Sequence, residues 1–224
     1  EKVEFKMTFK AKLMRFMYRH VVQPTPSIMN NAQDAYGAFR LEAIDAGSYD
    51  GTQALVFVNR DESKPLNGWV YIPQLGRTQT LASFSREESM FGSDILPSDF
   101  MGYTASLTAM NWKFKGSTFA LLPMYQHDRA TTSDLKARKV DYWHTDFHGR
   151  AGCFPKVSWQ LRETYILEGT TVANSESVSK RVLYIDTQTH LPILWKMYDS
   201  NNSLWKFAIN AYAHPTSHVT HNNN

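Results

Sequence analysis

The stretch WQLRETYILEGTTVANSESVSKRVLYIDTQTHLPILWKMYDSNNSLWKFAIN, residues 159–210, decides the fold because it predicts four consecutive β-strands. The predicted strands span residues 159–167, 178–186, 192–199 and 204–210, and each is rich in β-branched and aromatic residues. Gly, Asn, Asp or Ser residues bound every strand, which is typical of strand ends. Consecutive strands joined by short turns form an antiparallel sheet, so we expect one at this end of the chain.

Two turns of this stretch carry residues suited to tight conformations. Asp186 precedes the sequence TQTHLP, where its carboxylate can accept hydrogen bonds from backbone N–H groups. Pro192 begins the next strand, at a position that needs no backbone donor. In the sequence DSNNS, Asn201 and Asn202 tolerate the positive φ of a tight hairpin. The turns therefore favour a regular meander.

Both faces of the predicted meander carry apolar side chains. Alternation places Val182 and Tyr184 on one face, and Leu183 and Ile185 on the other. Because neither face is polar throughout, we expect both to be covered, one by helices and the other by loops or a ligand.

More strands and one short helix are predicted before this stretch. The strand candidates are residues 38–44, 54–59, 68–73, 111–115 and 118–124, and residues 77–85 can continue the third of them. Gly116 and Ser117 would form a two-residue hairpin loop between the last two candidates. Ser98 is a candidate N-cap for a short helix in residues 97–110. Residues 126–140 are polar and charged, which predicts a long loop.

The first twenty residues mix basic and apolar side chains and have two interpretations. Residues 3–9 alternate between apolar and polar, as in a half-buried strand. From residue 11 the apolar residues follow helical spacing, with Lys12, Arg15 and Arg19 between them. The segment is therefore either an amphipathic element packed on the core or a basic helix on a membrane surface.

Composition limits the class of protein. The chain has 224 residues, of which 42% are hydrophobic and 20% charged, so it can bury a core as one domain. We expect that domain over residues 1–213 and a disordered polar tail over residues 214–224. The formal charge of +3, from 24 Lys and Arg against 21 Asp and Glu, argues against nucleic-acid binding. No apolar run reaches the roughly 18 residues of a transmembrane helix.

Residues with reactive side chains form no strong catalytic or metal motif. His144 and His148 have the i, i+4 spacing of a helical metal pair, but no Glu stands at the HExxH position, and Gly149 makes the region loop-like. Cys153 is the single cysteine, so no intrachain disulfide forms. No G-x-S-x-G sequence surrounds a serine. We therefore expect a protein that is not an enzyme and that needs no cofactor or metal.

The sequence SKRVLYIDTQTHLPILWKMYDSNNSLWKF, residues 179–207, resembles a pattern found in lipoprotein-carrier proteins with the LolA/LolB-like fold. The resemblance is greatest to the envelope-protein branch described as domain of unknown function 1329. Residues 68–77, 110–126 and 159–170 agree with the same branch in order and rough spacing. Asn202 stands where the branch has a hairpin glycine. Its members are also usually longer, so this chain is a candidate fragment that lacks an N-terminal half.

The resemblance implies an α+β fold built on a strongly curved antiparallel sheet. That sheet would be an open half-barrel of about nine to eleven strands, with one or two short helices. It also implies an exported protein in the periplasm of the Gram-negative envelope, with no catalytic activity. Because related folds hold acyl chains on an apolar concave face, we expect binding, and transport, of a lipid or other hydrophobic ligand. Burial of an acyl chain contributes about 0.8 kcal/mol per CH₂.

Seven apolar residues are predicted to line the concave face and contact the ligand: Phe57, Trp69, Tyr71, Trp112, Phe114, Trp195 and Met197. Without a ligand, large aromatic residues on strands simply form core. Two other functions remain open. One is an interaction module that docks on an envelope transporter, an outer-membrane protein or a lipoprotein, through a sheet edge or residues 126–140. The other is an unrecognised hydrolase that uses His144, Asp146 or Cys153.

Overall fold

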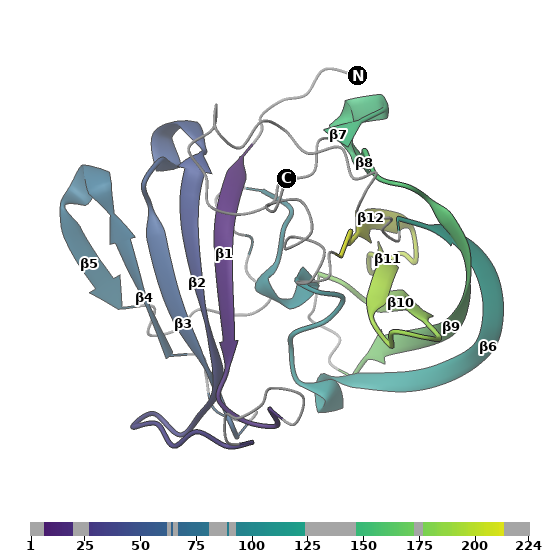
Figure 1. The fold of residues 1–224 in the computed structure, drawn as a ribbon, viewed down its shortest axis with the longest axis horizontal. Coiled ribbons are helices and arrows are strands. Elements are labelled where there is room, and N and C mark those ends of the chain that lie inside the picture. The colour runs from purple at the N-terminus through teal and green to yellow at the C-terminus, as the bar shows by residue number, and fades with distance from the viewer. Residues whose placement is uncertain are drawn as a thin grey trace, which may run out of the picture. The chain divides into compact units, whose positions relative to one another are not determined.

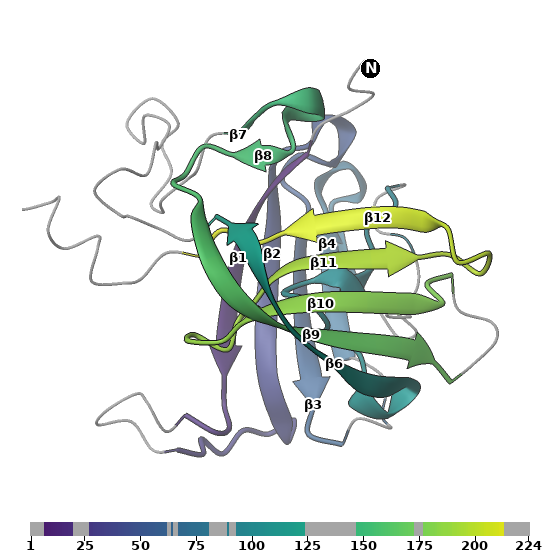
Figure 2. The same ribbon diagram turned by 90° about the vertical axis from the view of Figure 1, so that its right-hand side faces the viewer.

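The computed structural model describes residues 7–19, 27–61, 64, 67–80, 89, 93–123, 147–172 and 177–212. The chain divides into two compact units (Figures 1 and 2). The N-terminal unit is Val3–Pro97, and the C-terminal unit is Ser98–Asn224 together with Glu1–Lys2. The predicted loop over residues 126–140 and the predicted tail lie outside the described residues, and the single domain stays a prediction.

The N-terminal unit is a five-stranded antiparallel sheet in the order β1-β2-β3-β4-β5. Its strands are β1 (Thr8–Arg15), β2 (Ala35–Asp45), β3 (Gln53–Asn59), β4 (Asn67–Ile72) and β5 (Arg77–Thr80). The 3₁₀ turns η1 (Gly47–Tyr49) and η2 (Pro73–Leu75) precede β3 and β5. Strands β2 to β5 confirm the predicted ones, with ends that differ by one to three residues; residues 81–85 are not described.

Strand β1 decides between the two interpretations of the basic N-terminal segment. It pairs with β2 from Thr8 to Arg15, so these residues are extended. The helical spacing of apolar residues from residue 11 does not produce a helix there. The helix interpretation is therefore wrong for these residues. The ladder to β2 pairs the backbone groups on one side of β1, and this tertiary pairing outweighs the local apolar spacing.

The C-terminal unit contains a second five-stranded antiparallel sheet, in the order β12-β11-β10-β9-β6 (Figure 2). Its strands are β6 (Met110–Leu122), β9 (Gln160–Thr171), β10 (Lys180–Asp186), β11 (Pro192–Tyr198) and β12 (Leu204–Ile209). A two-stranded ribbon of β7 (Phe147–His148) and β8 (Phe154–Pro155) surrounds the turn η6 (Arg150–Gly152). The four-strand meander is confirmed, with Asp186 accepting from the Thr189 N–H at 2.8 Å and Asn202 at φ +59°.

The predicted hairpin at Gly116 and Ser117 is wrong, because β6 is one continuous strand. It pairs with β9 along its whole length, with a β-bulge between Phe114 and Gly116. Gly116 has φ +106°, a conformation that serves a bulge as well as a hairpin turn. Figure 1 shows β6 and β9 as a pronounced arc.

The predicted short helix in residues 97–110 is also wrong. Two 3₁₀ turns stand there, η3 (Pro97–Asp99) and η4 (Leu107–Ala109), and the part of the chain that the structure describes contains no α-helix. The N-cap of η4 is Ser106, whose Oγ accepts from the Thr108 N–H. The Ser98 hydroxyl instead accepts from a guanidinium on β10.

The fold of the described residues is thus antiparallel β rather than α+β. Their twelve strands form two five-stranded sheets and one ribbon, where the sequence predicted a single sheet. In this same set of residues no helix is long and apolar enough to cross a bilayer.

Candidate ligand-binding surface

Three of the seven predicted ligand contacts lie together on one face of the N-terminal sheet. Trp69 pairs with Leu55 and Tyr71 pairs with Gln53, and side chains directly opposite one another point to the same side. Phe57, two residues from Leu55, shares this side, and its ring centroid lies 6.0 Å from that of Trp69. We call this side the Trp69 face.

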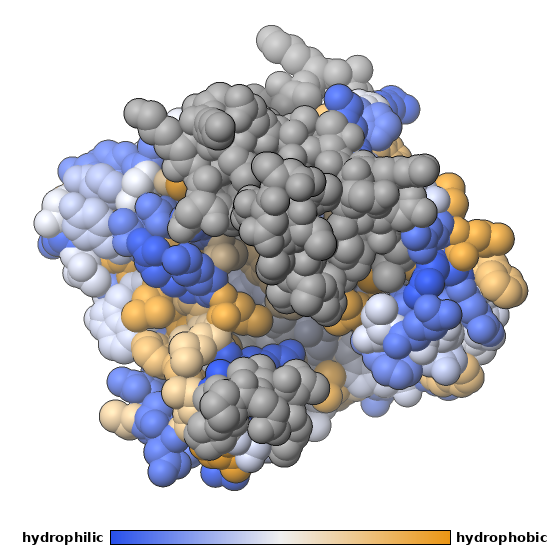
Figure 3. Space-filling model, viewed as in Figure 1, coloured by the Kyte–Doolittle hydropathy of each residue, from blue (hydrophilic) through white to orange (hydrophobic). Residues whose placement is uncertain are grey.

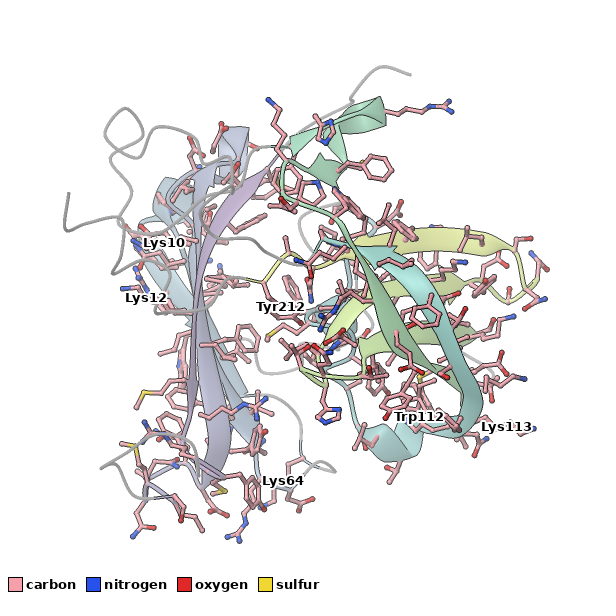
Figure 4. The ribbon with its side chains drawn as sticks, turned by 45° about the vertical axis from the view of Figure 1, so that its right-hand side comes forward. Lys10, Lys12, Lys64, Trp112, Lys113 and Tyr212 are labelled. Atoms are coloured by element: carbon pink, nitrogen blue, oxygen red, sulfur yellow. The ribbon has the colours of Figure 1, made fainter. Side chains whose placement is uncertain are left out.

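The other four predicted contacts share one face of the C-terminal sheet. One ladder row contains Trp112, Gly169, Arg181 and Met197, and the row beside it contains Phe114, Leu167, Leu183 and Trp195. We call this side the Trp195 face. The opposite side, which carries Lys113, Tyr184, Lys196 and Phe207, is the Tyr184 face. In Figure 4, Trp112 and Lys113 extend from β6 in opposite directions, as this alternation requires. For all seven residues, contact with a ligand stays a prediction.

The two predicted residues on β11 are buried. Trp195 is 3% exposed and Met197 is 2% exposed, and neighbouring Leu183 on β10 is also buried. The Trp195 Nε1 has no hydrogen-bond partner among the described residues. A buried donor left in this way costs about 1–3 kcal/mol. These side chains therefore belong to the core of the unit, and the described part of the chain offers no partner to the indole nitrogen.

A cluster of charged residues covers the Trp195 face over β10 to β12. Asp99, the last residue of η3, accepts from Arg181 Nη1 at 2.7 Å and from Lys206 Nζ at 2.7 Å. Ser98 Oγ accepts from Arg181 Nη2 at 2.9 Å. The Tyr103 ring lies 5.4 Å from the guanidinium carbon. We call these five residues the Asp99 cluster.

The charges of the Asp99 cluster are removed from water. The Arg181 side chain is 2% exposed, and those of Asp99 and Lys206 are about one-tenth exposed. Desolvation of such charges is costly, so a buried ion pair adds little net stability, yet the loss of one partner is strongly destabilising. The cluster therefore fixes the segment from residue 98 to residue 103 on the sheet.

Trp112 is half-buried and also serves the packing of the unit. Its Nε1 donates to the Leu107 carbonyl at 3.0 Å, and its ring lies 5.2 Å from the Tyr103 ring. Gly169 leaves room for the indole, because a Cβ there would lie 2.6 Å from the ring. Trp112 therefore holds η4 against the sheet.

Beyond the Asp99 cluster, over β6 and β9, the Trp195 face is exposed. Leu121 pairs with Leu161, Ser117 pairs with Tyr165, and the Phe114 ring lies 5.9 Å from the Tyr165 ring. The exposed fractions are 66% for Phe114, 68% for Phe119, 57% for Leu121, 69% for Leu161 and 39% for Tyr165. We call these five residues the β6–β9 strip.

The strip is apolar but not unbroken. Glu163, opposite Phe119, and Ser117 lie on the same face between its members. In Figure 3, hydrophobic side chains are exposed at the right, beside the arc of β6 and β9. A cluster of exposed large apolar side chains rimmed by polar residues marks interaction or ligand sites.

The sequence prediction found Phe114 and missed the rest of the strip. Simple alternation from Phe114 would put Phe119 on the opposite face. The extra residue of the bulge brings both to the same face. The usable signal was Gly116 inside a strand pattern, which suggests a bulge.

A second buried carboxylate closes the turn after β10. The Asp186 carboxylate accepts hydrogen bonds from Arg162 Nε at 2.8 Å and from Arg162 Nη2 at 3.0 Å. It also accepts from the backbone N–H and the hydroxyl of Thr189. Burial raises the pKa of Asp186, but the hydrogen bonds from Arg162 and Thr189 outweigh it, so this pKa lies below its ordinary value. The hydrogen bond to Asp186 raises the Arg162 pKa. This pair stabilises the turn.

The residues proposed for chemistry are far less organised. Cys153 is exposed, and His148 lies on the ribbon strand β7. His144 and Asp146 lie outside the described residues, so the structure does not test the predicted pair. Within the described ranges, no group of three His, Cys, Asp or Glu side chains is placed to hold a metal ion.

The family model described as protein of unknown function DUF1329 matches residues 4–223, and the chain belongs to this family. The resemblance of residues 179–207 is thereby confirmed. No curated protein matches the chain.

Three solved structures are similar to this chain. A DUF1329 family protein from Desulfovibrio piger is 19% identical over 76% of this chain and 55% of its own, with a TM-score of 0.46. An outer membrane lipoprotein-sorting protein domain from Vibrio parahaemolyticus is 14% identical over 83% of this chain and 61% of its own, with a TM-score of 0.51. The complex of the CwlD amidase with the GerS lipoprotein from Clostridioides difficile matches at 11% identity, 94% and 87% coverage and a TM-score of 0.40.

The likeness to the Vibrio domain shows a LolA-like fold. This chain spans 55% and 61% of the lengths of the first two structures.

Proposed function

We propose that this DUF1329 family member binds a lipid or another hydrophobic ligand on the β6–β9 strip and carries it, without chemical change, in the cell envelope. The observation that carries the proposal is the exposure of five large apolar side chains on one face of two paired strands. The fold supports it, because a lipoprotein-sorting domain shares it. Periplasmic location and an open half-barrel in the whole protein are part of the proposal.

Apolar burial supplies the affinity. An acyl chain laid along the strip would leave water together with the side chains that it covers, and each buried CH₂ contributes about 0.8 kcal/mol. A fully covered Phe or Leu side chain contributes about 1.5–3 kcal/mol more than an exposed one. Glu163 and Ser117, on the same face, offer hydrogen bonds to a polar end of the ligand.

A binding assay with a fluorescent fatty acid tests the proposal. The double variant Phe119→Ser with Leu161→Ser should weaken binding about tenfold or more, because it removes two of the most exposed apolar side chains of the strip. The matched control is Phe207→Ser on the Tyr184 face, where Phe207 is 47% exposed and lies opposite Lys196. The control should bind within about twofold of the native chain.

Native mass spectrometry of the purified chain gives a second measurement. We expect bound lipid on the native chain and on the control, and less of it on the double variant. A native chain that carries no lipid and takes up no fatty acid would overturn the proposal. Equal losses in the double variant and the control would overturn the strip as the site.

A further inference from the structure

The Trp69 face of the N-terminal sheet combines basic and aromatic residues in two neighbouring rows. One row contains Lys12, Arg40, Leu55, Trp69 and Thr80, and the next contains Lys10, Glu42, Gln53, Tyr71 and Thr78. Each row thus runs from a lysine on the edge strand β1 to an aromatic residue on β4. Since neighbouring strands lie about 4.8 Å apart, the lysine and the aromatic residue of a row are roughly 14 Å apart.

Several large apolar side chains are exposed on the Trp69 face. Leu55, Trp69 and Tyr71 are 37–39% exposed, and Met14 at the end of β1 is 45% exposed. On the opposite face, Leu41, Ala43 and Val56 on β2 and β3 are buried, and only Leu13 on the edge strand is an exposed large apolar residue of the described sheet. An antiparallel sheet with one wet face usually has polar residues there. The exposed aromatic residues therefore mark a surface that meets something other than water.

Positive charge dominates the described part of the Trp69 face. Lys12 lies directly opposite Arg40, and like charges in opposed positions are destabilising. Arg40 also contacts Glu42 at 3.1 Å and Gln53 at 2.8 Å, so Glu42 offsets part of the charge. Lys10 and Lys12 extend to the same side of the sheet in Figure 4. A surface with anionic groups would complement this arrangement.

We propose that the Trp69 face docks the protein onto a bilayer surface that contains anionic phospholipids. Lys10, Lys12 and Arg40 face the headgroup phosphates, while Trp69 and Tyr71 lie at the level of the headgroups. Trp and Tyr favour this depth because an apolar ring and a polar atom are satisfied there together. Lysines near an anionic surface add attraction that salt screens. This docking is independent of the proposed ligand site, since the strip lies on the other unit.

Co-flotation of the full chain with lipid vesicles tests the docking. We expect binding to vesicles of phosphatidylcholine mixed with phosphatidylglycerol, and at least about fivefold less to phosphatidylcholine alone. High salt should release the protein, because it screens the attraction between the lysines and the headgroups. The Debye length is about 10 Å at 0.1 M salt and shorter at higher concentrations.

Two variants and two controls locate the surface. Lys12→Glu and Trp69→Ser should each lower binding to the anionic vesicles about fivefold or more. The matched controls are Lys113→Glu and Phe207→Ser on the Tyr184 face of the C-terminal sheet, and both should bind like the native chain. Circular dichroism confirms folding, and Lys12→Gln provides a milder variant if Lys12→Glu unfolds.

The docking would be overturned by no flotation with anionic vesicles, by equal flotation with neutral ones, or by equal losses in variants and controls. Capture of a protein partner without vesicle binding would have the same consequence. Fatty-acid uptake by the Lys12→Glu chain separates the two proposals. We expect it to be unchanged, so the failure of one proposal is distinguishable from the failure of the other.

Discussion

The two ends of the Trp195 face differ in how they are covered. Over β10 to β12 the segment from residue 98 to residue 103 is bound to the sheet through Arg181, and Leu183 and Trp195 are buried. Over β6 and β9 the same face leaves Phe119 and Leu161 more than two-thirds exposed. The difference teaches that one sheet face can be core at one end and an interaction surface at the other. The Asp99 cluster lies on the covered side.

The largest expected loss of stability comes from a substitution at the covered end of the Trp195 face. Asp99→Ala removes the carboxylate that Arg181 and Lys206 share, and the loss of one partner of a buried ion pair costs about 3–5 kcal/mol. Urea unfolding of the variant checks this. Lys115→Ala is a matched control, because the Lys115–Glu168 pair is partly exposed and should contribute about 1 kcal/mol or less. Equal effects would mean that the Asp99 cluster is not a buried anchor.

The next prediction compares one residue type at both ends. Leu183→Ala should lower the free energy of unfolding by about 2–4 kcal/mol, because it leaves a cavity in packed core. Leu161→Ala should change the same quantity by about 0.5 kcal/mol or less, because its side chain is 69% exposed. Thermal or urea unfolding measures both. A large loss for Leu161→Ala would show that the strip is core.

The third prediction concerns the turn at the end of β10. Asp186→Asn should cost about 2 kcal/mol at neutral pH, because the charged hydrogen bonds to Arg162 are weakened. The folded-state pKa of Asp186 is lowered, so its contribution is fully present above the unfolded value of about 3.9. It is lost as pH falls through the folded-state pKa.

Urea unfolding of both chains at neutral and acid pH checks this sign. The difference in stability between the native chain and Asp186→Asn should be constant above about pH 5 and shrink below about pH 4. A difference that grew on acidification would contradict the lowered pKa.

The smallest expected effect tests the bulge. Gly116→Ala should destabilise the chain by about 1 kcal/mol, because an L-residue at φ +106° is strained. The cost is conformational alone, since a Cβ at this position meets no atom within 4 Å. Ser117→Ala, exposed beside it, should be neutral in the same unfolding measurement. Equal stability of both variants would mean that the strand relaxes its bulge freely.

The sequence predicted local features of the fold well where a residue type fits only one local conformation. Asp186 and Asn202 stand where their turns need a carboxylate acceptor and a positive φ. Gly116 misled the prediction, because positive φ suits both a hairpin and a bulge. Only the pairing of β6 with β9 decides between them.

Long-range contacts account for the other differences. Arg181 and Asp99 lie 82 residues apart in the chain, and no local sequence pattern predicts their contact. The residue type of Ser98 suits a helix N-cap, yet its hydroxyl accepts from Arg181. The exposed strip was likewise hidden, since exposure depends on what the rest of the chain covers.

The bulge on β6 shifts the alternation of side chains between the two faces by one residue. Phe114 and Phe119 are five residues apart, so an unbroken ladder would turn them to opposite sides. Deletion of Lys115 would restore a regular ladder while leaving each side chain on the face it now has. The extra residue therefore adds a bend and a local increase in twist. A single residue can thus change the curvature of this sheet without changing which side chains lie on each face.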